Sequence, residues 1–330
     1  MRGFRVLVVG LLLSVWWAPV RAEGPFRKLD NFLSRQQMRQ NADSGYIYRP
    51  QQRFMVRTRG DLSGSFLKMS EIDRINRYDV DLHSSLRYKQ NIALGYRTLV
   101  LGFSFNPFKK SSDKEFAIRY FGNRFGGEII RGKVGSLKGT VRLGDEVLHV
   151  PESIYSDRYW QVGGYYVFNA KRFSLPAAMT QAYIQRRSAG SALVTASYRF
   201  VRSDGKSVQP EDGTLHQDIR SHLIGIGGGY GYNWVPSSHW LLHLSATESF
   251  GLWGRTRVDT GEGKYDLKGR FPQLMTTGNV SVVYYYKSFY ACALFSVDHS
   301  HMPTKEESLG ELFYVGMTRL QGRISVGYRF

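Results

Sequence analysis

The sequence contains very little cysteine and, after its first residues, no long apolar run. Cys292 is the single cysteine, so no second thiol is present for an internal disulfide or a cysteine-based metal site. Beyond Ala22 no apolar stretch approaches the roughly 20 residues that a membrane-spanning helix needs. These absences exclude a disulfide-stabilised scaffold and a helical membrane protein.

Acidic residues are also in the minority. Lys and Arg number 45 against 27 Asp and Glu, a formal net charge of +18. Such an excess usually indicates nucleic-acid binding, but the chain has no basic helix or aromatic–basic motif of a known reader. We therefore expect no nucleic-acid partner. Attraction to anionic lipid headgroups, or a basic lumen for anionic solutes, fits the charge better.

The N-terminal region has the composition of a secretory signal. Arg2 and Arg5 form a short positive region, an apolar run covers Val6–Trp17, and Val20-Arg21-Ala22 is a small-x-small cleavage site. As a helix the run would rise only about 18 Å, against a hydrocarbon core of roughly 30 Å. We expect three parts: a cleaved signal peptide (1–22), a periplasmic N-terminal segment with a short helix (23–45) and a membrane domain (46–330).

The C-terminal residues are typical of the final strand of an outer-membrane barrel. Ile324, Val326 and Phe330 share one face of an extended strand, while Arg323 and Arg329 share the other. An apolar outer face, a polar inner face and a closing aromatic residue match the known pattern of these barrels. The aromatic end also predicts recognition by the barrel-assembly machinery.

Period-two alternation recurs along the chain and predicts an all-β protein, a transmembrane antiparallel β-barrel of twelve strands. The expected strands are residues 52–60, 76–88, 92–105, 114–124, 125–135, 156–168, 188–201, 220–234, 239–253, 271–287, 289–301 and 318–330. Short turns would then share one end with the termini, and long polar loops the other. Fourteen strands is the alternative, because 169–187 is too long for a turn and 308–316 could form a further strand.

Two further patterns fit a barrel. Aromatic residues flank the predicted short turns, as in an interfacial girdle; they are Tyr284, Tyr285, Tyr286, Phe289, Trp234 and Trp240. A glycine row occupies one strand face and leaves room for a neighbouring side chain, a plug helix or a substrate; it comprises Gly225, Gly227, Gly229 and Gly231. Close packing of a neighbour is the favoured interpretation.

Several blocks resemble one protein family. They are Leu94–Asn106, Asn169–Ser174, Gln185–Ser191 and the glycine-rich strand after Ser221. Over about residues 46–330 the chain resembles the secreted Gram-negative family called domain of unknown function 4421. The resemblance implies an outer-membrane β-barrel and supplies no catalytic or binding residues.

Charged residues on the polar strand faces are the candidates for function. We expect the lumen to be lined by Arg57, Asp79, Asp81, His83, Arg87, Arg199, His243, Arg323 and Arg329. A carboxylate near a histidine can activate water, but residues i and i+2 of a strand lie about 7 Å apart. Partners must therefore come from other strands, and ion pairing across the lumen is the simpler interpretation. We expect no cofactor and no metal site.

Three functions remain open from the sequence. The first is a non-enzymatic barrel, either a narrow channel or a structural or interaction component, with a basic lumen that favours anions. The second is an outer-membrane hydrolase using His83 or His243 with an acid, and the third is a soluble secreted β-sandwich that binds ligands. Since a closed sheet has no free edge to pair, a monomer is expected.

Basic residues also fall in the predicted outer loops, and they are Lys109, Lys110, Arg255 and Arg257. Contact with lipopolysaccharide phosphates is one interpretation, and ordinary solvated loops are the other. Outer-membrane lipid and lipopolysaccharide are accordingly the expected partners.

Overall fold

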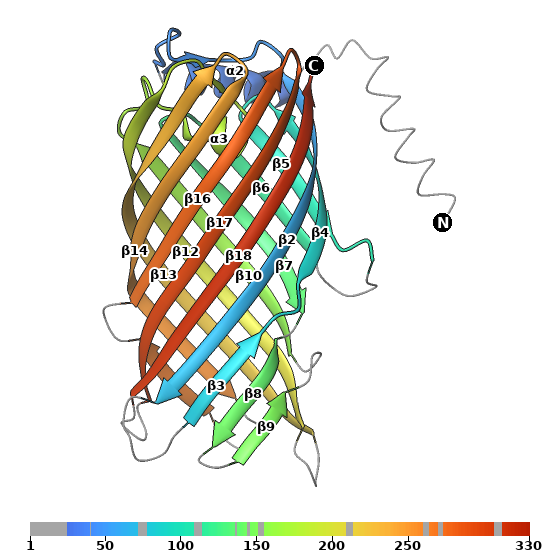
Figure 1. Cartoon of the computed structure of the whole chain (residues 1–330), viewed down its shortest axis with the longest axis vertical. Coiled ribbons are helices and arrows are strands. Elements are labelled where there is room, and N and C mark those ends of the chain that lie inside the picture. The colour runs from blue at the N-terminus through green and yellow to red at the C-terminus, as the bar shows by residue number, and fades with distance from the viewer. Residues whose placement is uncertain are drawn as a thin grey trace. The chain divides into compact units, whose positions relative to one another are not determined.

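The computed structural model (Figure 1) describes residues 25–39, 41–71, 78–108, 114–135, 137–143, 146–150, 155–208, 214–259, 264–269, 273–306 and 312–330. The expected signal peptide lies outside these ranges. The first described element is helix α2 (Pro25–Arg39), where a short N-terminal helix was predicted. None of the described helices has both the length and the apolar character needed to cross a membrane.

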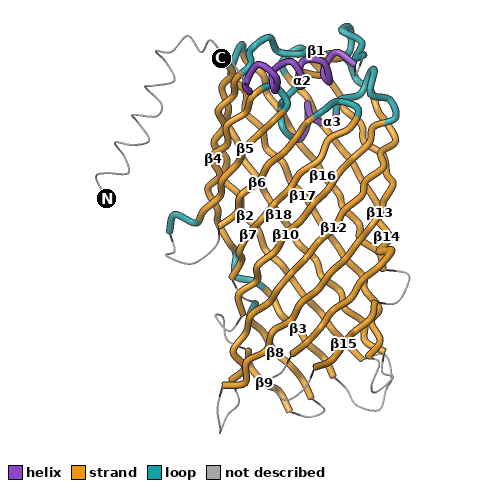
Figure 2. Tube along the Cα trace, turned by 180° about the vertical axis from the view of Figure 1, so that it is seen from behind, coloured by secondary structure: helices purple, strands orange, loops and turns teal. Residues whose placement is uncertain are grey.

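Twelve antiparallel strands form a closed barrel, as predicted (Figures 1 and 2). They are β2 (Phe54–Glu71), β4 (Arg87–Tyr96), β5 (Leu99–Phe105), β6 (Lys114–Phe121), β7 (Phe125–Gly135), β10 (Tyr155–Val167), β12 (Ala189–Val208), β13 (Thr214–Ser237), β14 (Trp240–Asp259), β16 (Gln273–Tyr286), β17 (Phe289–Glu306) and β18 (Leu312–Arg329). Each pairs with the next in this order, and β18 pairs with β2 to close the ring. Two backbone hydrogen bonds fasten this seam, from Phe54 N to Phe330 O (3.1 Å) and from Phe330 N to Phe54 O (3.0 Å).

The two ends of the barrel differ. Short turns, including 97–98, 238–239 and 287–288, gather at the end that holds the C-terminus, here called the turn end (Figure 1). At the opposite loop end, β3 (Tyr78–His83), β8 (Lys138–Leu143) and β9 (Glu146–Val150) extend the sheet beyond β2. There β15 (Lys264–Gly269) pairs with β14 and β17. In transmembrane barrels the short turns face the periplasm.

The outer face of the barrel is apolar and the inner face is polar. In β18, Ile324 and Val326 are 71% and 49% exposed, whereas Ser325 between them is 5% exposed. Exposed aromatic side chains gather on the outer face near the turn end; they include Phe54, Trp234, Trp240, Tyr284, Tyr286, Phe289, Tyr328 and Phe330. The predicted girdle is therefore present, except that Tyr285 is buried and points inward. An apolar band with an aromatic belt fits acyl chains and the lipid interface.

The strand boundaries after β2 differ from the prediction. Expected strand 76–88 is divided between β3 and the start of β4, and expected strand 92–105 contains the β4–β5 hairpin with its turn at Arg97–Thr98. The residues between these two expected strands, 89–91, lie inside β4 rather than in a turn. Arg97 adopts a φ of 54°, a conformation that turns usually assign to Gly or Asn, so the residue type gave no signal for this turn.

The fourteen-strand alternative is wrong. Residues 169–187 contain no transmembrane hairpin but a short helix and a two-residue strand, and residues from Leu312 onward belong to β18.

Candidate binding site in the barrel lumen

A segment folded into the barrel closes it at the turn end. Residues 168–188, here called the plug, connect β10 to β12 and contain α3 (Leu175–Met179) and β11 (Ile184–Gln185). Strand β11 pairs with β1 (Ile47–Tyr48) in a separate two-stranded sheet. Ser174 caps α3, because its Oγ accepts a hydrogen bond from Ala177 N at 3.3 Å.

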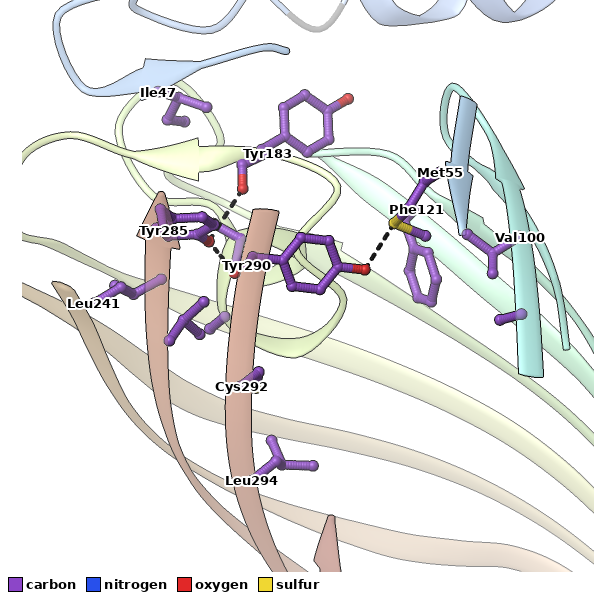
Figure 3. Close-up of a cluster of buried hydrophobic side chains, with 14 residues drawn as sticks. Ile47, Met55, Val100, Phe121, Tyr183, Leu241, Tyr285, Tyr290, Cys292 and Leu294 are labelled. Atoms are coloured by element: carbon purple, nitrogen blue, oxygen red, sulfur yellow. Dashed lines mark hydrogen bonds between the residues drawn. The ribbon is translucent and has the colours of Figure 1, made fainter. Parts of the chain in front are cut away.

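Apolar side chains of the plug pack against the inner wall (Figure 3). Ala177, Ala178 and Tyr183 share one buried cluster with wall residues of β14, β16 and β17, namely Leu241, Val283, Tyr285, Tyr290, Cys292 and Leu294. Phe173 lies in a second cluster with Leu193 of β12. Contacts of this kind stabilise by about 25 cal/mol per Å² of apolar area. The turn end of the lumen is therefore a packed core rather than a water-filled passage.

Hydrogen bonds attach the plug to the wall. The Tyr285 hydroxyl is within hydrogen-bonding distance of the carbonyl oxygens of Ala177 (2.8 Å) and Tyr183 (3.3 Å). The guanidinium of Arg329, which is buried, donates to the carbonyl of Gln181 and lies over the Tyr285 ring, 5.6 Å from its centroid. Arg329 faces inward, but its contacts hold the plug instead of lining an open pore.

Removing the Tyr285 hydroxyl should loosen the plug. In Tyr285→Phe the buried carbonyl of Ala177 loses its hydrogen-bond donor. Leaving a buried polar group unpaired costs about 1–3 kcal/mol of stability. We expect faster hydrogen–deuterium exchange across residues 168–188 in the folded, detergent-extracted protein. The matched control is Tyr284→Phe, whose ring lies on the outer face. Equal protection in both variants would show that this hydrogen bond does not hold the plug.

His243 belongs to the anchor of the plug. It is 2% exposed, and its ring nitrogens lie 2.7 Å from Asn233 Oδ1 and 3.0 Å from Ser245 Oγ. Asn233 in turn donates to the carbonyl of Ser174 (2.9 Å) and to Gln185 Oε1 (3.0 Å). The histidine thus faces the barrel interior, but its described partners include no carboxylate with which it could act in hydrolysis.

The glycine row makes room for close neighbours. A Cβ at Gly231 would lie 3.0 Å from Phe173 Cζ of the plug and 3.4 Å from His243 Cε1. A Cβ at Gly229 would lie only 2.1 Å from the carbonyl oxygen of Ala246 on β14. Close packing, the favoured interpretation of the row, is confirmed at these two positions.

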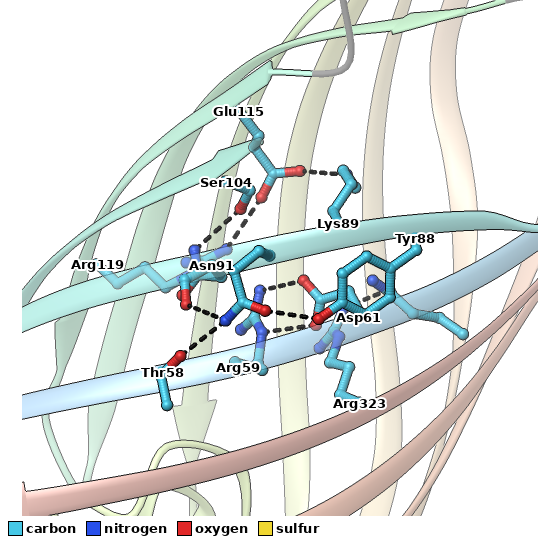
Figure 4. Close-up of polar contacts among 12 residues, drawn as sticks. Thr58, Arg59, Asp61, Tyr88, Lys89, Asn91, Ser104, Glu115, Arg119 and Arg323 are labelled. Atoms are coloured by element: carbon cyan, nitrogen blue, oxygen red, sulfur yellow. Dashed lines mark hydrogen bonds and ion pairs between the residues drawn. The ribbon is translucent and has the colours of Figure 1, made fainter. Parts of the chain in front are cut away.

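Beyond the plug, toward the loop end, the inner wall carries a charged layer (Figure 4). Three ion pairs define it: Arg59–Asp61 at 2.7 Å, Lys89–Glu115 at 3.1 Å and Arg119–Glu128 at 2.8 Å. All six side chains come from four of the five neighbouring strands β2 to β7 of the ring, namely β2, β4, β6 and β7. The carboxylates on this side of the lumen are therefore already engaged by basic partners.

Two inward-facing arginines of the same layer lack a counter-charge of their own. Arg57 is 3% exposed, and its Nε and that of Arg323 are buried with no hydrogen-bond partner within the described residues. Asp61 lies opposite Arg323 on the neighbouring strand but is engaged by Arg59. Burying an uncompensated charge costs several kcal/mol. The layer is thus short of negative charge and suited to a bound anion.

The wall formed by β12, β13 and β14 is different. Its inward residues at the same depth are small and uncharged, and they include Thr195, Ser197, Gly225, Gly227 and Ser249. Arg199 of β12 is exposed to the lumen, where its Nη2 donates to Gln161 Oε1 at 3.3 Å. The lumen therefore has a charged wall on β2 to β7 and a wall of mostly small residues on β12, β13 and β14.

Three predicted lumen residues do not line the lumen. Asp79, Asp81 and His83 lie on β3, outside the twelve-strand ring, and all three are exposed. They pair with residues of the outer face of β2; for example, Asp81 lies opposite Lys68, with 3.6 Å between the charged groups. The predicted alternation of polar and apolar residues in β3 is correct, but the polar residues lie on the outer face instead of the inner one. Strand β3 lies beyond the lipid band, where an outer face need not be apolar.

The other candidates are placed as follows. Arg87 begins β4 and pairs with Ser63, on the inner face. Lys109 and Lys110 lie outside the described residues. Arg255 and Arg257 lie on the outer face of β14, both paired with Asp266. Within the described ranges, no group of three or more His, Cys, Asp or Glu side chains could hold a metal ion.

The closed ring, its apolar outer band and its aromatic belt define a transmembrane β-barrel. The family model described as "Domain of unknown function (DUF4421)" matches residues 41–330, and the chain belongs to that family. No curated protein matches the sequence.

Solved structures with a similar arrangement are distant in sequence. The outer membrane protease OmpT from Escherichia coli is 8% identical, with a TM-score of 0.40, and the match covers 85% of this chain and 97% of that chain. The Pseudomonas putida toluene transporter TodX is 9% identical, with a TM-score of 0.36 and coverage of 85% and 90%. The β domain of the Bordetella autotransporter BrkA is 10% identical, with a TM-score of 0.37 and coverage of 83% and 99%.

Proposed function

We propose that this protein is a non-enzymatic outer-membrane barrel that binds an anionic solute in its lumen and is closed on the periplasmic side by the plug. The observation that carries this proposal is the buried, uncompensated charge of Arg57 and Arg323 beside ion pairs that already use the nearby carboxylates. An anion held there would accept hydrogen bonds from the unpaired Nε donors of both arginines, while Arg323 Nη2 keeps its hydrogen bond to Gln321 Oε1. Arg is well suited to hold an anion by its planar set of donors.

The plug favours a binding role over a permanently open channel. Its packed contacts with β14, β16 and β17 leave the charged layer accessible only from the loop end. A solute entering there would meet Arg199 first and the Arg57–Arg323 region deeper in the lumen. The protein would then act as a receptor or interaction component, or as a carrier whose plug moves in response to a partner.

The arginine pair is tested by ion selectivity. In a variant whose plug residues 175–183 are replaced by a flexible linker, we expect a pore that prefers Cl⁻ to K⁺ in a KCl gradient. Adding Arg57→Gln and Arg323→Gln should move the reversal potential most of the way to zero, because the inner wall loses its two positive charges that have no carboxylate of their own. The control is Arg142→Gln on β8, outside the barrel ring. An unchanged reversal potential in the double variant would refute the anion site.

We also propose that residues 1–22 direct export and are removed, that residues 23–45 are a periplasmic segment, and that residues 46–330 are the membrane domain. The leader composition supports cleavage after Ala22. Mass analysis of the protein extracted from outer-membrane fractions should give an N-terminus at Glu23. Recovery of the full-length protein in the inner membrane would argue against this arrangement.

A further inference from the structure

The strand register brings six basic residues into one continuous row across six neighbouring strands. Lys114 pairs with Lys133, Lys133 with Arg158, Arg158 with Arg202, Arg202 with Arg220, and Arg220 with Arg257. The row, here called the cationic row, runs from β6 through β7, β10, β12 and β13 to β14. Like charges directly opposite each other on a sheet destabilise it, so such a row requires anions.

The cationic row faces outward. Its members share a strand face with exposed apolar residues, because Lys114, Arg158 and Arg220 each lie four residues from such a residue on the same strand. These apolar residues are Ile118, Val162 and Ile224. Two members of the row are half-buried, namely Lys133 and Arg202. The other four are exposed. The row therefore belongs to the surface of the barrel and is separate from the lumen.

Two further rows lie between the cationic row and the turn end. The adjacent one is mixed aromatic and basic and consists of Phe116, Arg131, Trp160, Phe200, His222 and Arg255. The next is apolar or aromatic throughout and consists of Ile118, Ile129, Val162, Tyr198, Ile224 and Trp253. Successive rows are about 7 Å apart along a strand. This order, from apolar to aromatic to cationic, is the one expected where acyl chains give way to headgroups.

The half of the row on β12–β14 is neutralised within the protein. Asp218 pairs with Arg202 (3.0 Å) and with Arg220 (2.7 Å). Asp266 of β15 pairs with Arg257 (3.0 Å) and Arg255, and these hydrogen bonds lower the pKa of Asp266 to about 2. Asp266 therefore stays ionised at any physiological pH, and this half needs no external anion.

The half on β6–β10 has no such neutralisation. Lys114, Lys133 and Arg158 form no ion pair with any carboxylate in the described part of the chain, and the Arg131 guanidinium lies 5.1 Å from the centroid of the Trp160 ring. We propose that this β6–β10 patch (Lys114, Arg131, Lys133 and Arg158) is a binding site for a phosphate of lipid A, the membrane anchor of lipopolysaccharide. Its acyl chains would lie against Ile118, Ile129 and Val162.

Charge and position together select this ligand. A phosphate supplies the two negative charges and the several acceptor oxygens that adjacent Lys and Arg side chains need. The patch lies at the rim of the apolar surface on the side of the long loops, which in these barrels faces the outer leaflet. A phosphorylated glycolipid presents its phosphates at that level and its acyl chains below it. The proposal does not depend on the lumen site.

Binding of lipid A tests the patch directly. In detergent, the triple variant Lys114→Gln, Lys133→Gln and Arg158→Gln should bind diphosphoryl lipid A about tenfold more weakly than the unaltered protein, equivalent to about 1.4 kcal/mol. A matched control variant removes the same charge from the loop-end extensions and should bind lipid A as tightly as the unaltered protein. Its substitutions are Lys138→Gln, Arg142→Gln and Lys264→Gln. If both triple variants lost the same affinity for lipid A, binding would depend only on net charge and not on the patch, and the proposal would be wrong.

A second measurement uses the unaltered protein and so does not depend on the folding of a variant. Lipid A from which the phosphates have been removed should bind about tenfold more weakly than diphosphoryl lipid A, the equivalent of about 1.4 kcal/mol. Phosphatidylglycerol vesicles should compete poorly, because their single phosphates are not matched to the row. Equal affinity for lipid A with and without phosphates, or full competition by the vesicles, would contradict the proposed site.

Discussion

Replacing residues 175–183 with a Gly-Ser linker of equal length should turn an electrically silent barrel into an anion-selective pore. Twelve strands spaced about 4.8 Å and tilted about 40° enclose a backbone ring roughly 24 Å across. The described structure fills the turn end of this ring with α3 and its apolar contacts. Without them, the lumen would connect the two sides of the membrane past the charged layer.

Planar-bilayer recording would check this expectation. The unaltered protein should give no resolvable current steps, and the linker variant should give discrete openings with a reversal potential of the anion-selective sign. Both proteins must show the same heat-modifiable gel migration, which reports a closed barrel. A silent linker variant would place the closure elsewhere in the lumen, and cation-selective openings would contradict the basic character assigned to the layer.

The second large effect is expected at Gly229. In Gly229→Ala the new methyl group would lie 2.1 Å from the carbonyl oxygen of Ala246 and 2.7 Å from Thr247 Cα, and both are main-chain atoms that cannot rotate away. Relief requires separation of β13 from β14, two strands paired over most of their length. Overpacking commonly costs 1–3 kcal/mol and occasionally more; here we expect about 3 kcal/mol or more, because the backbone must move.

A closely matched control is available in the same sheet. Gly278 of β16 has no atom within 4 Å of the position a Cβ would take, so Gly278→Ala should fold as the unaltered protein does. The measurement is the folded fraction after refolding into detergent micelles over a urea series. Similar midpoints for the two variants would show that β13 and β14 are not held as closely as the structure indicates.

Much of the barrel could be predicted from alternation alone. The last strand is an example: Ile324 and Val326 face outward and Ser325 inward, as period two requires. The count of twelve was also correct, although one hairpin was misplaced. Leu99-Val100-Leu101 is apolar on both faces, so alternation had no signal there, and the turn at Arg97–Thr98 contains neither Gly nor Pro.

The plug and the cationic row were beyond sequence reasoning for a different reason. The sequence indicates only that residues 169–187 are too long for a turn. That Phe173, Ala177 and Tyr183 pack inside the barrel depends on wall residues far away in sequence. The cationic row likewise exists only through register, since Lys114 and Arg257 belong to strands five pairings apart. For β3, the sequence does not show that the strand lies beyond the lipid band. There the rule that apolar side chains face outward and polar ones inward no longer holds.

The seam between β2 and β18 has a consequence for biogenesis. Phe54 and Phe330 are joined by reciprocal main-chain hydrogen bonds, yet nearly the whole membrane domain separates them in sequence. Such a contact cannot form until synthesis has delivered both partners, and its loop-closure entropy is large. Until the last strand is available, the edges of β2 and β18 stay unpaired and open to aggregation, so this topology completes its fold only after the whole chain has been delivered.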